Sequence, residues 1–456
     1  MVREIRRAPA LLAAAGFILL CPGQTHAATN VTVSGRQILV DGQPFIARGV
    51  CYQPTPIGHN PSAAPPWGDY YTLSYRSIYE RDLPNMRQMG ANLIRVYSWD
   101  TTASHLDFLN KAYNTNRQPL YVLLNRWINP QSDWSNPSVV AALTNEFRNL
   151  ALNAASHPTV LGVIIGNELN RGNESNSNFW NAVNRIAAAV KRVATNKLVT
   201  VAVTDIPAVI GQWNAHMTNI DCWSVQVYRG TSFGSFFNTY SNGSSKPLLI
   251  TEYGLDAFNQ TTGAIYPNNA QAVADAVQTL WRQMRTNRLV ASGGCLFSYA
   301  DEWWKAAGTV NVHDPGGFPR TGYPDGFSNE EWYGIFGIAD NGTNPDILQP
   351  RALFSKLEYL WGTPTNLTLR ASLNAGRLQT VFRRRADRDD LRYELEASDT
   401  LTTNWIVIAR SDRGGNTQNL GAASVVEQTA GDERIVTVVN SPGTSRRFNR
   451  LRVTRY

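Results

Sequence analysis

The sequence is poor in cysteine, in histidine and in long apolar runs, and each shortage excludes a class of protein. Among 456 residues there are four cysteines and six histidines, with no CxxC, HxH or HExxH spacing. A disulfide-rich scaffold and a metal centre are therefore not expected, and we predict no metal and no cofactor. Cys51, Cys222 and Cys295 lie in apolar runs and are expected to be buried thiols. Beyond the N-terminal stretch, no run is apolar enough for a transmembrane helix.

The net charge of +7 comes from the two ends of the chain. Residues 28–363 contain 24 basic and 24 acidic side chains, so no basic groove for nucleic acid is expected in the main body. Residues 364–456 contain fifteen arginines and ten acidic residues. This basic tail could contact an acidic glycan or the cell surface. In the plainer interpretation, its arginines pair with acidic neighbours such as Asp387, Asp389, Asp390 and Glu394.

The first 27 residues have the features of an export signal. Three arginines precede the apolar stretch Ala10–Leu20, which is too short to span a bilayer, and a small-residue site ends at Ala27. We expect a signal peptide over residues 1–27 and a secreted or periplasmic protein. A lipid anchor on Cys21 is the less favoured alternative, because the bulky Leu20 precedes it.

Eight short apolar runs alternate with amphipathic segments along the main body, which predicts parallel strands with helices between them. Eight such units fit a closed (β/α)8 barrel better than an open doubly wound sheet. The first run leads into Gln53-Pro54-Thr55-Pro56, whereas an open nucleotide-binding sheet needs a glycine-rich turn there. The expected strands lie within residues 45–53, 91–99, 119–127, 160–168, 198–205, 222–228, 247–254 and 293–304.

The fold prediction is therefore an α/β protein with a (β/α)8 TIM barrel over residues 28–362, opened by a β-hairpin that turns at Asp41-Gly42. After Gly362 the chain alternates between apolar and polar residues with frequent turns, which predicts an all-β sandwich over residues 363–456. Long connections over 52–75 and 305–346 are expected to border an active site. The expected helices lie within residues 79–89, 137–155, 178–194, 269–285 and 350–360.

Two of the expected strands deliver a glutamate. Glu168 follows VLGVIIGN, and Glu252 lies within KPLLITEYG. Strand ends of a parallel barrel face one mouth, so the two side chains could oppose each other there. Retaining glycoside cleavage needs two carboxyl groups, one to give a proton and one to attack the sugar. A lone strand-end glutamate is more often a surface charge, but a pair with polar neighbours favours an active site.

Polar residues at neighbouring strand ends suit this pair. Arg95 would keep Glu252 ionised, unless it forms an ordinary barrel ion pair, and Tyr228 could donate to the same carboxylate. Asn167 could bind a sugar 2-hydroxyl. Glu330 and Glu331 are expected to be solvated loop charges. Further candidates for contact with substrate are Tyr97, Asp100, Asp205, Trp303 and Trp304.

Four motifs carry a family resemblance. GNE on the fourth run, TEYG on the seventh, IRVYS on the second and QVY on the sixth resemble clan A of the glycoside hydrolases. The stretches FIARGVCYQ and RDLPNMRQMGANLIRVYSWD look closest to the β-1,3-glucanosyltransferases, beside family two-type catalytic barrels. The resemblance implies a retaining (β/α)8 enzyme with Glu168 as acid/base and Glu252 as nucleophile. It also implies that Tyr52, Asn167 and Tyr228 lie in the subsite next to the cleaved bond.

Together these observations predict a secreted retaining β-glycosidase or transglycosidase that acts on a β-linked glycan, with β-1,3-glucan favoured. The expected partner is a polysaccharide or oligosaccharide, and no nucleic acid. Two alternatives stay open. One is a β-mannanase or β-galactosidase-type hydrolase, and the other is a catalytically silent glycan-binding protein built on the same barrel.

Overall fold

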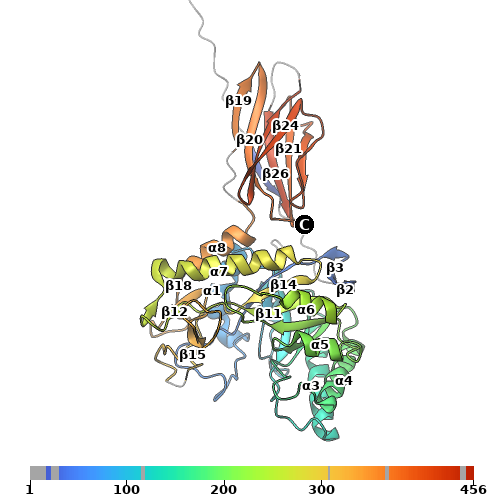
Figure 1. The fold of residues 1–456 in the computed structure, drawn as a ribbon, viewed down its shortest axis with the longest axis vertical. Helices are drawn as coiled ribbons and strands as arrows, with labels where there is room; N and C mark the ends of the chain where they lie inside the picture. The colour runs from blue at the N-terminus through green and yellow to red at the C-terminus, as the bar shows by residue number, and fades with distance from the viewer. Residues whose placement is uncertain are drawn as a thin grey trace, which may run out of the picture. The chain divides into compact units, whose positions relative to one another are not determined.

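The computed structural model describes residues 17–21, 30–114, 119–306, 309–364, 369–441 and 448–455. The chain divides into two compact units (Figure 1). One is formed within residues 25–362, and the other within residues 363–456 together with residues 17–21. No helix among the described residues is both long and apolar enough to cross a bilayer.

The first unit is a closed barrel of eight parallel strands, which confirms the predicted (β/α)8 fold. Each strand pairs with the next along the chain, and the last pairs with the first to close the ring. Nearly every strand residue is buried, because helices cover the outside and side chains fill the centre. The strands are β5 (Ala47–Cys51), β6 (Leu93–Arg95), β7 (Tyr121–Arg126), β8 (Val160–Ile165), β9 (Leu198–Val203), β10 (Cys222–Gln226), β11 (Leu248–Tyr253) and β14 (Ala291–Leu296).

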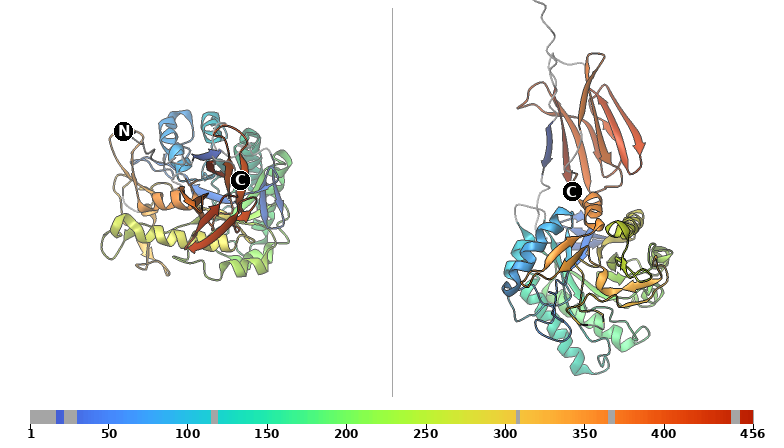
Figure 2. Two further views of the ribbon diagram at one scale, coloured as in Figure 1. Left: turned by 90° about the horizontal axis from the view of Figure 1, so that it is seen from above. Right: turned by 90° about the vertical axis from the view of Figure 1, so that its left-hand side faces the viewer.

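The described residues of this unit form eight α-helices. Helices surround the strands in the left view of Figure 2. The five expected helices are present with shifted ends, and three shorter ones escaped prediction. Those three, α2, α5 and α6, have only seven or eight residues, too few for a clear apolar period. The helices are α1 (Arg76–Gln88), α2 (Leu106–Tyr113), α3 (Pro137–Ala154), α4 (Ser177–Val193), α5 (Pro207–Trp213), α6 (Phe236–Gly243), α7 (Pro267–Thr286) and α8 (Ala352–Trp361).

Side-chain caps fix where two of the long helices begin. Asn136 accepts a hydrogen bond from the Ser138 amide at the start of α3, and Pro137 occupies the first turn, where its missing N–H costs nothing. Asn176 accepts from the amides of Asn178 and Phe179 at the start of α4. These caps define the ends of the loops that follow β7 and β8.

A small three-stranded sheet precedes the barrel, formed by β2 (Val31–Ser34), β3 (Gln37–Val40) and β4 (Gln43–Pro44). The predicted turn at Asp41-Gly42 joins β3 to β4, and both residues have positive φ, at 48° and 77°, which is the geometry of a type I′ hairpin turn. Gly35, with φ 56°, lies in a second tight turn between β2 and β3 that the prediction omitted.

The long connections after β11 and β14 carry short hairpins and a 3-10 turn. The eighth expected strand was too long, because β14 ends at Leu296 and the apolar residues beyond it belong to the loop. Those residues stay apolar because they are buried below the barrel mouth. The added elements are β12 (Phe258–Asn259), β13 (Ala264–Ile265), β15 (Gly317–Pro319), β16 (Phe327–Asn329), η2 (Glu330–Trp332), β17 (Phe336–Ala339) and β18 (Ile347–Pro350), while η1 (Leu73–Tyr75) precedes α1.

The second unit contains the predicted all-β region, arranged as two sheets (Figure 2). Inward residues such as Phe382, Leu395, Val436 and Leu451 form its core. The four-stranded sheet has the order β19 (Arg370–Asn374), β20 (Arg377–Arg385), β25 (Glu433–Val439), β24 (Ser424–Ala430). The five-stranded sheet has the order β1 (Phe17–Cys21), β26 (Phe448–Arg455), β21 (Leu391–Ser398), β22 (Ile406–Asp412), β23 (Gln418–Asn419).

Most residues of the expected signal peptide lie outside the described residues. Within it, Phe17–Cys21 form β1, which pairs in parallel with β26. The export signal therefore stays a prediction.

The arginines of the second unit form ion pairs with acidic neighbours. Arg452 reaches both Glu394 at 2.7 Å and Glu396 at 3.0 Å. Arg388 lies 2.6 Å from Asp390, and Arg384 lies 2.7 Å from Glu427. This pairing supports the plainer interpretation of the basic tail, in which its arginines pair with acidic neighbours.

Gly90, just after α1, packs closely against the end of α8. Its φ is 82°, and a Cβ added there would lie 2.3 Å from the carbonyl of Trp361, which is backbone and cannot rotate away. We expect Gly90→Ala to destabilise the protein by about 3 kcal/mol or more, from left-handed strain plus the collision.

The matched control is Gly35→Ala, where φ is 56° and no atom lies within 4 Å of the added Cβ. That variant should lose only about 1–2 kcal/mol. Urea unfolding followed by tryptophan fluorescence measures both changes, and equal losses in the two variants would contradict this account of the packing.

Candidate active site

A cavity of about 990 Å³ opens at the carboxyl ends of the barrel strands. Its lining includes both predicted glutamates, Glu168 after β8 and Glu252 in β11, so strands four and seven deliver them to one space. Tyr97, Asn167, Tyr228 and Trp304 of the predicted site also line it. The cavity is therefore where the predicted site residues meet.

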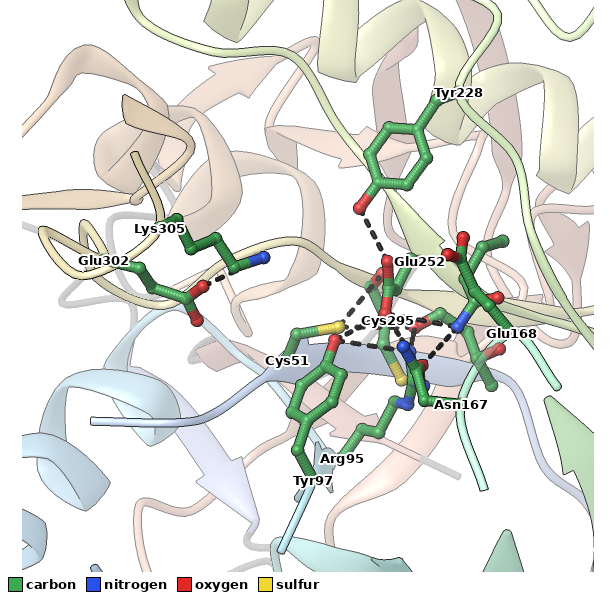
Figure 3. A network of polar contacts seen from close by, with 12 residues as sticks. Cys51, Arg95, Tyr97, Asn167, Glu168, Tyr228, Glu252, Cys295, Glu302 and Lys305 are labelled. Carbon is green, nitrogen blue, oxygen red and sulfur yellow. Dashed lines mark hydrogen bonds and ion pairs between the residues drawn. The ribbon is translucent and has the colours of Figure 1, made fainter. Parts of the chain in front are cut away.

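Glu252 lies in a ring of hydrogen-bond donors (Figure 3). Its Oε1 accepts from Arg95 Nη1 at 2.7 Å, from the Tyr97 hydroxyl at 2.7 Å and from Gln226 Nε2 at 3.2 Å. Its Oε2 accepts from the Tyr228 hydroxyl alone among the described residues, at 2.8 Å. The two carboxylate oxygens are therefore unequal, and Oε2 is the less engaged.

The charge state of Glu252 follows from this ring. Burial alone would raise the pKa of the carboxyl, but the Arg95 guanidinium opposes it, followed by Lys305 and the two tyrosine hydroxyls, and the result lies below its usual value. Glu252 is thus an anion held in a nearly dry place.

Glu168 stands on strained backbone. It has φ 48°, a left-handed value that a residue with a Cβ rarely adopts, and Gly166 two residues before it has φ 60°. These two left-handed residues follow the end of β8, and Glu168 lines the cavity. There Arg171 forms an ion pair with Glu168 Oε2. Such a conformation persists only where its surroundings impose it, and it is typical of functional sites.

The pKa of Glu168 moves in the opposite direction from that of Glu252. Burial is the largest cause of the rise, and the negative charge of Glu252 adds to it, against the partial opposition of Arg171, Arg95 and Lys305. Burial and neighbouring charges thus displace the pKa values of the two carboxyl groups in opposite directions. A nucleophile and a general acid at one sugar carbon need such a difference.

Asn167, directly before Glu168, is oriented by two donors. Its Oδ1 accepts from Arg95 Nη2 and, at 2.6 Å, from Gln226 Nε2. Because the carbonyl oxygen is engaged twice, the amide NH2 group is left to donate to a ligand in the cavity. Arg95 thus positions both Asn167 and Glu252.

Three predicted substrate contacts do not line the cavity. Tyr52 is fully buried, and its hydroxyl donates to Asp82 Oδ2 at 2.8 Å, so it supports α1 instead of a sugar. Arg95 is also fully buried and touches the site only through its partners. Trp303 stacks on His313 with ring centres 4.8 Å apart. Arg95 and Trp303 were expected at the cavity because they lie at or beside a strand end, and Tyr52 because of the family resemblance, but none of the three belongs to the lining.

Other predicted residues are found at the cavity or near it. Asp100 and Asp205, candidates for contact with substrate, line the cavity. Glu330 also lines it and is exposed to solvent, as expected of a loop charge. Glu331 is completely buried and accepts from the amides of Ala306 and Asp314, which corrects its expected exposure. Gln226 belongs to the QVY motif but was given no role in the site. Its contacts with Asn167 and Glu252 join three strand ends that are far apart in the sequence.

Lys305 is the main omission. It lines the cavity in the loop after β14, with its Nζ 3.2 Å from Glu302 Oε2 and 4.3 Å from the centre of the Phe297 ring. Glu302 is buried, and burial raises its pKa to about 7 despite the lysine. A Glu-x-x-Lys spacing in a loop does not predict an active-site lysine. The second cation that acts on Glu252 is therefore identified from the structure.

No group of three or more histidine, cysteine, aspartate or glutamate side chains that could hold a metal occurs among the described residues. Cys51, Cys222 and Cys295 are buried free thiols, as predicted.

Comparison with known protein families gives a match to the glucanosyltransferase family model over residues 22–323. Protein EPD1 of Candida maltosa is 22% identical over 312 residues, which cover 64% of this chain and 53% of that protein. The 1,3-beta-glucanosyltransferase GAS5 of Saccharomyces cerevisiae is 24% identical over 308 residues, which cover 64% and 60%. The chain thus spans between half and three fifths of the length of these two relatives.

Among solved structures, an FMN-binding beta-glucuronidase from Facaelibacterium prausnitzii has a TM-score of 0.52 at 14% identity, covering 92% of this chain and 58% of that one. A beta-galacturonidase from Eisenbergiella tayi, bound to glycerol, has a TM-score of 0.51 at 15% identity, covering 75% and 55%. These likenesses concern the fold alone.

Lys305 offers a direct test of the site's electrostatics. Its charge lowers the pKa of both Glu252 and Glu168, so Lys305→Met should raise both pKa values. Lys305→Arg should leave them near their original values. Carbon-13 NMR titration of the carboxyl groups, assigned by difference against Glu252→Gln and Glu168→Gln, measures the change.

Lys111→Met is the control, because Lys111 pairs with Glu80 away from the cavity. The double variant Lys305→Met/Glu302→Gln removes the buried carboxylate that the single variant leaves without its cation. Unchanged titration of both glutamates in a folded Lys305→Met protein would show that the lysine does not act on them.

Proposed function

This chain belongs to the glucanosyltransferase family, and from that membership we propose that it cleaves a β-1,3-glucan chain and transfers the new end to a second sugar. The observation that carries the proposal is the pair of glutamates in one cavity with oppositely displaced pKa values. That pair suits a double displacement with retention of configuration.

In the first step, Glu252 attacks the anomeric carbon while Glu168 gives its proton to the leaving glycosidic oxygen. We assign the attack to Oε2, because Oε1 is engaged by three donors and Oε2 by one. The carbon–oxygen bond of the glycoside breaks as the glycosyl-Glu252 ester forms. The released chain leaves with the proton of Glu168.

In the second step, the Glu168 carboxylate takes a proton from the acceptor hydroxyl as that oxygen attacks the anomeric carbon. The ester bond to Glu252 breaks, and the carboxylate returns to its ring of donors. A sugar hydroxyl as acceptor gives transfer, and water gives hydrolysis. Family membership favours transfer.

Neighbouring residues have supporting roles in this scheme. Arg95 keeps the buried Glu252 ionised and fixes Asn167, whose free NH2 group is placed to bind the sugar 2-hydroxyl. Trp304 is available as an apolar floor for the reacting sugar. No step needs a metal or a cofactor.

We further propose that the protein is exported, on the evidence of its N-terminal 27 residues. A cell-surface or acidic-glycan partner for residues 363–456 has less support, because the arginines there are paired internally.

A silent glycan-binding protein is the alternative of another class. Binding alone would give no reason to displace the pKa values of two neighbouring carboxyl groups in opposite directions, and that difference supports catalysis. A β-mannan or β-galactoside specificity is an alternative within the same reaction, and activity confined to those substrates would replace the glucan proposal.

Replacing each glutamate should have a distinct chemical outcome. Glu252→Ala should reduce turnover of a laminarioligosaccharide by a factor of at least about 10³, because the attacking oxygen is gone. Added azide should then restore product as the α-glycosyl azide, by one direct displacement of the β-glycoside. Product anomers are read by proton NMR.

Glu168→Ala keeps the nucleophile, so a substrate with an activated leaving group should still form the glycosyl-enzyme, and azide should give the β-glycosyl azide. Circular dichroism confirms that both variants are folded. A folded Glu252→Ala variant with several per cent of normal turnover, or a swapped pair of azide anomers, would reject the assignment.

The second unit should be dispensable for chemistry. All residues that line the cavity lie between Gln53 and Tyr333, within the barrel unit. A chain ending at Gly362 should therefore keep kcat on a short soluble oligosaccharide within about twofold of the intact protein, as measured by product chromatography. A folded truncated protein without activity on that substrate would show that the second unit helps to build the site.

A further inference from the structure

Two tryptophans at the cavity have unusually exposed side chains. Trp67 is 55% exposed and Trp127 is 60% exposed, and both line the cavity. No other tryptophan of the described residues is classed as exposed. Leaving two large apolar side chains in water costs stability, so their position calls for a partner that covers them.

Trp67 is held outward by a fixed and strained loop. Its own φ is 55°, and it follows Pro65 and Pro66. The next residue, Gly68, has φ 85° and packs so closely that a Cβ there would lie 2.6 Å from Gln53 Nε2. Asp69 then anchors the loop, with Oδ2 2.8 Å from His105 Nε2. The positive φ of Trp67 strains the backbone, and strained residues of this kind cluster at binding and active sites. The strain therefore points to a role in binding.

Trp127 is fixed in a similar way. It directly follows Arg126, the last residue of β7, whose Nη1 donates to the Trp99 carbonyl at 3.3 Å. Ile128 on its other side is buried. The indole is therefore carried between two anchored residues at the cavity rim.

The loops after β5, β6 and β7 are tied together beneath these indoles. The Asp100 amide donates to Asp69 Oδ2 at 3.0 Å, which joins the first loop to the second, and Arg126 joins the second to the third. The lining after β8 and β9 includes Arg171, Thr204 and Asp205 and no aromatic side chain of the described residues. The two exposed indoles therefore lie together on one part of the lining.

We infer that Trp67 and Trp127 bind sugar residues of the β-glucan chain beyond the one that is cleaved. The inference rests on the proposed function, because that function supplies a long neutral chain as the occupant. A pyranose ring presents an apolar face of C–H groups that stacks on an indole without displacing charge. Contacts with distant sugars that are equally strong in the ground state and the transition state lower KM for long substrates and leave kcat unchanged.

The test is the dependence of KM on chain length. Trp67→Ala and Trp127→Ala should each raise KM for laminarin about fivefold or more, with kcat within twofold of the original protein. KM for an activated laminaribioside should not change. Trp67→Phe and Trp127→Phe should recover most of the loss, because an aromatic face remains. Leu289→Ala is the control, since Leu289 is 72% exposed and does not line the cavity.

Binding is measured separately, by calorimetry of laminarin with the Glu252→Gln protein and with its Trp67→Ala/Trp127→Ala derivative. The expected result is a Kd raised at least fivefold by the two alanines. An unchanged KM and Kd, with the original protein active on laminarin, would overturn the inference and leave the proposed function intact. An equal loss of kcat on the short substrate would mean that the tryptophans only shape the site, which also overturns it. Absence of turnover on every β-glucan would reject the proposed function itself.

Discussion

The site depends on one buried ion pair, between the Arg95 guanidinium and the Glu252 carboxylate. Arg95 has no exposed surface, and a lone charge at such depth would be strongly unfavourable. With Glu252 at 2.7 Å the two charges neutralise each other, and the guanidinium also donates to Asn167 and to the Thr251 carbonyl. Glu252 is therefore ionised because of a residue that does not line the cavity. The negative charge of Glu252 in turn helps to raise the pKa of Glu168, so one contact influences the charge of both carboxyl groups.

Barrel geometry makes this contact available. Parallel strands place Arg95 at the end of β6, Gln226 at the end of β10 and Glu252 in β11 around one axis, although they are far apart in the sequence. Gly49 lets β5 and β14 pack closely where the barrel closes, since a Cβ on Gly49 would lie 2.5 Å from the Cys295 sulfur.

Much of this arrangement could be predicted from the sequence, because strand ends carry their own signal. The eight apolar runs specified the barrel, and GNE and TEYG located the two glutamates. Side-chain direction carries no such signal. Tyr52 and Trp303 lie at or beside strand ends yet do not line the cavity, and Lys305 reaches it from an irregular loop. The short helices α2, α5 and α6 were missed because seven or eight residues contain too few turns to show a period.

The mutual dependence of Arg95 and Glu252 also restricts how a lineage with this barrel could lose its activity. A mutation that removes only one partner leaves the other charge buried and unpaired, which costs about 3–5 kcal/mol of a stability that is seldom more than 15. Evolution toward a glycan-binding protein without activity would therefore pass through a variant of low stability, unless Arg95 and Glu252 changed together. Loss of Glu168, whose partner Arg171 lies at the surface, is the easier first step. In descendants that have abandoned catalysis, the acid should disappear before the nucleophile.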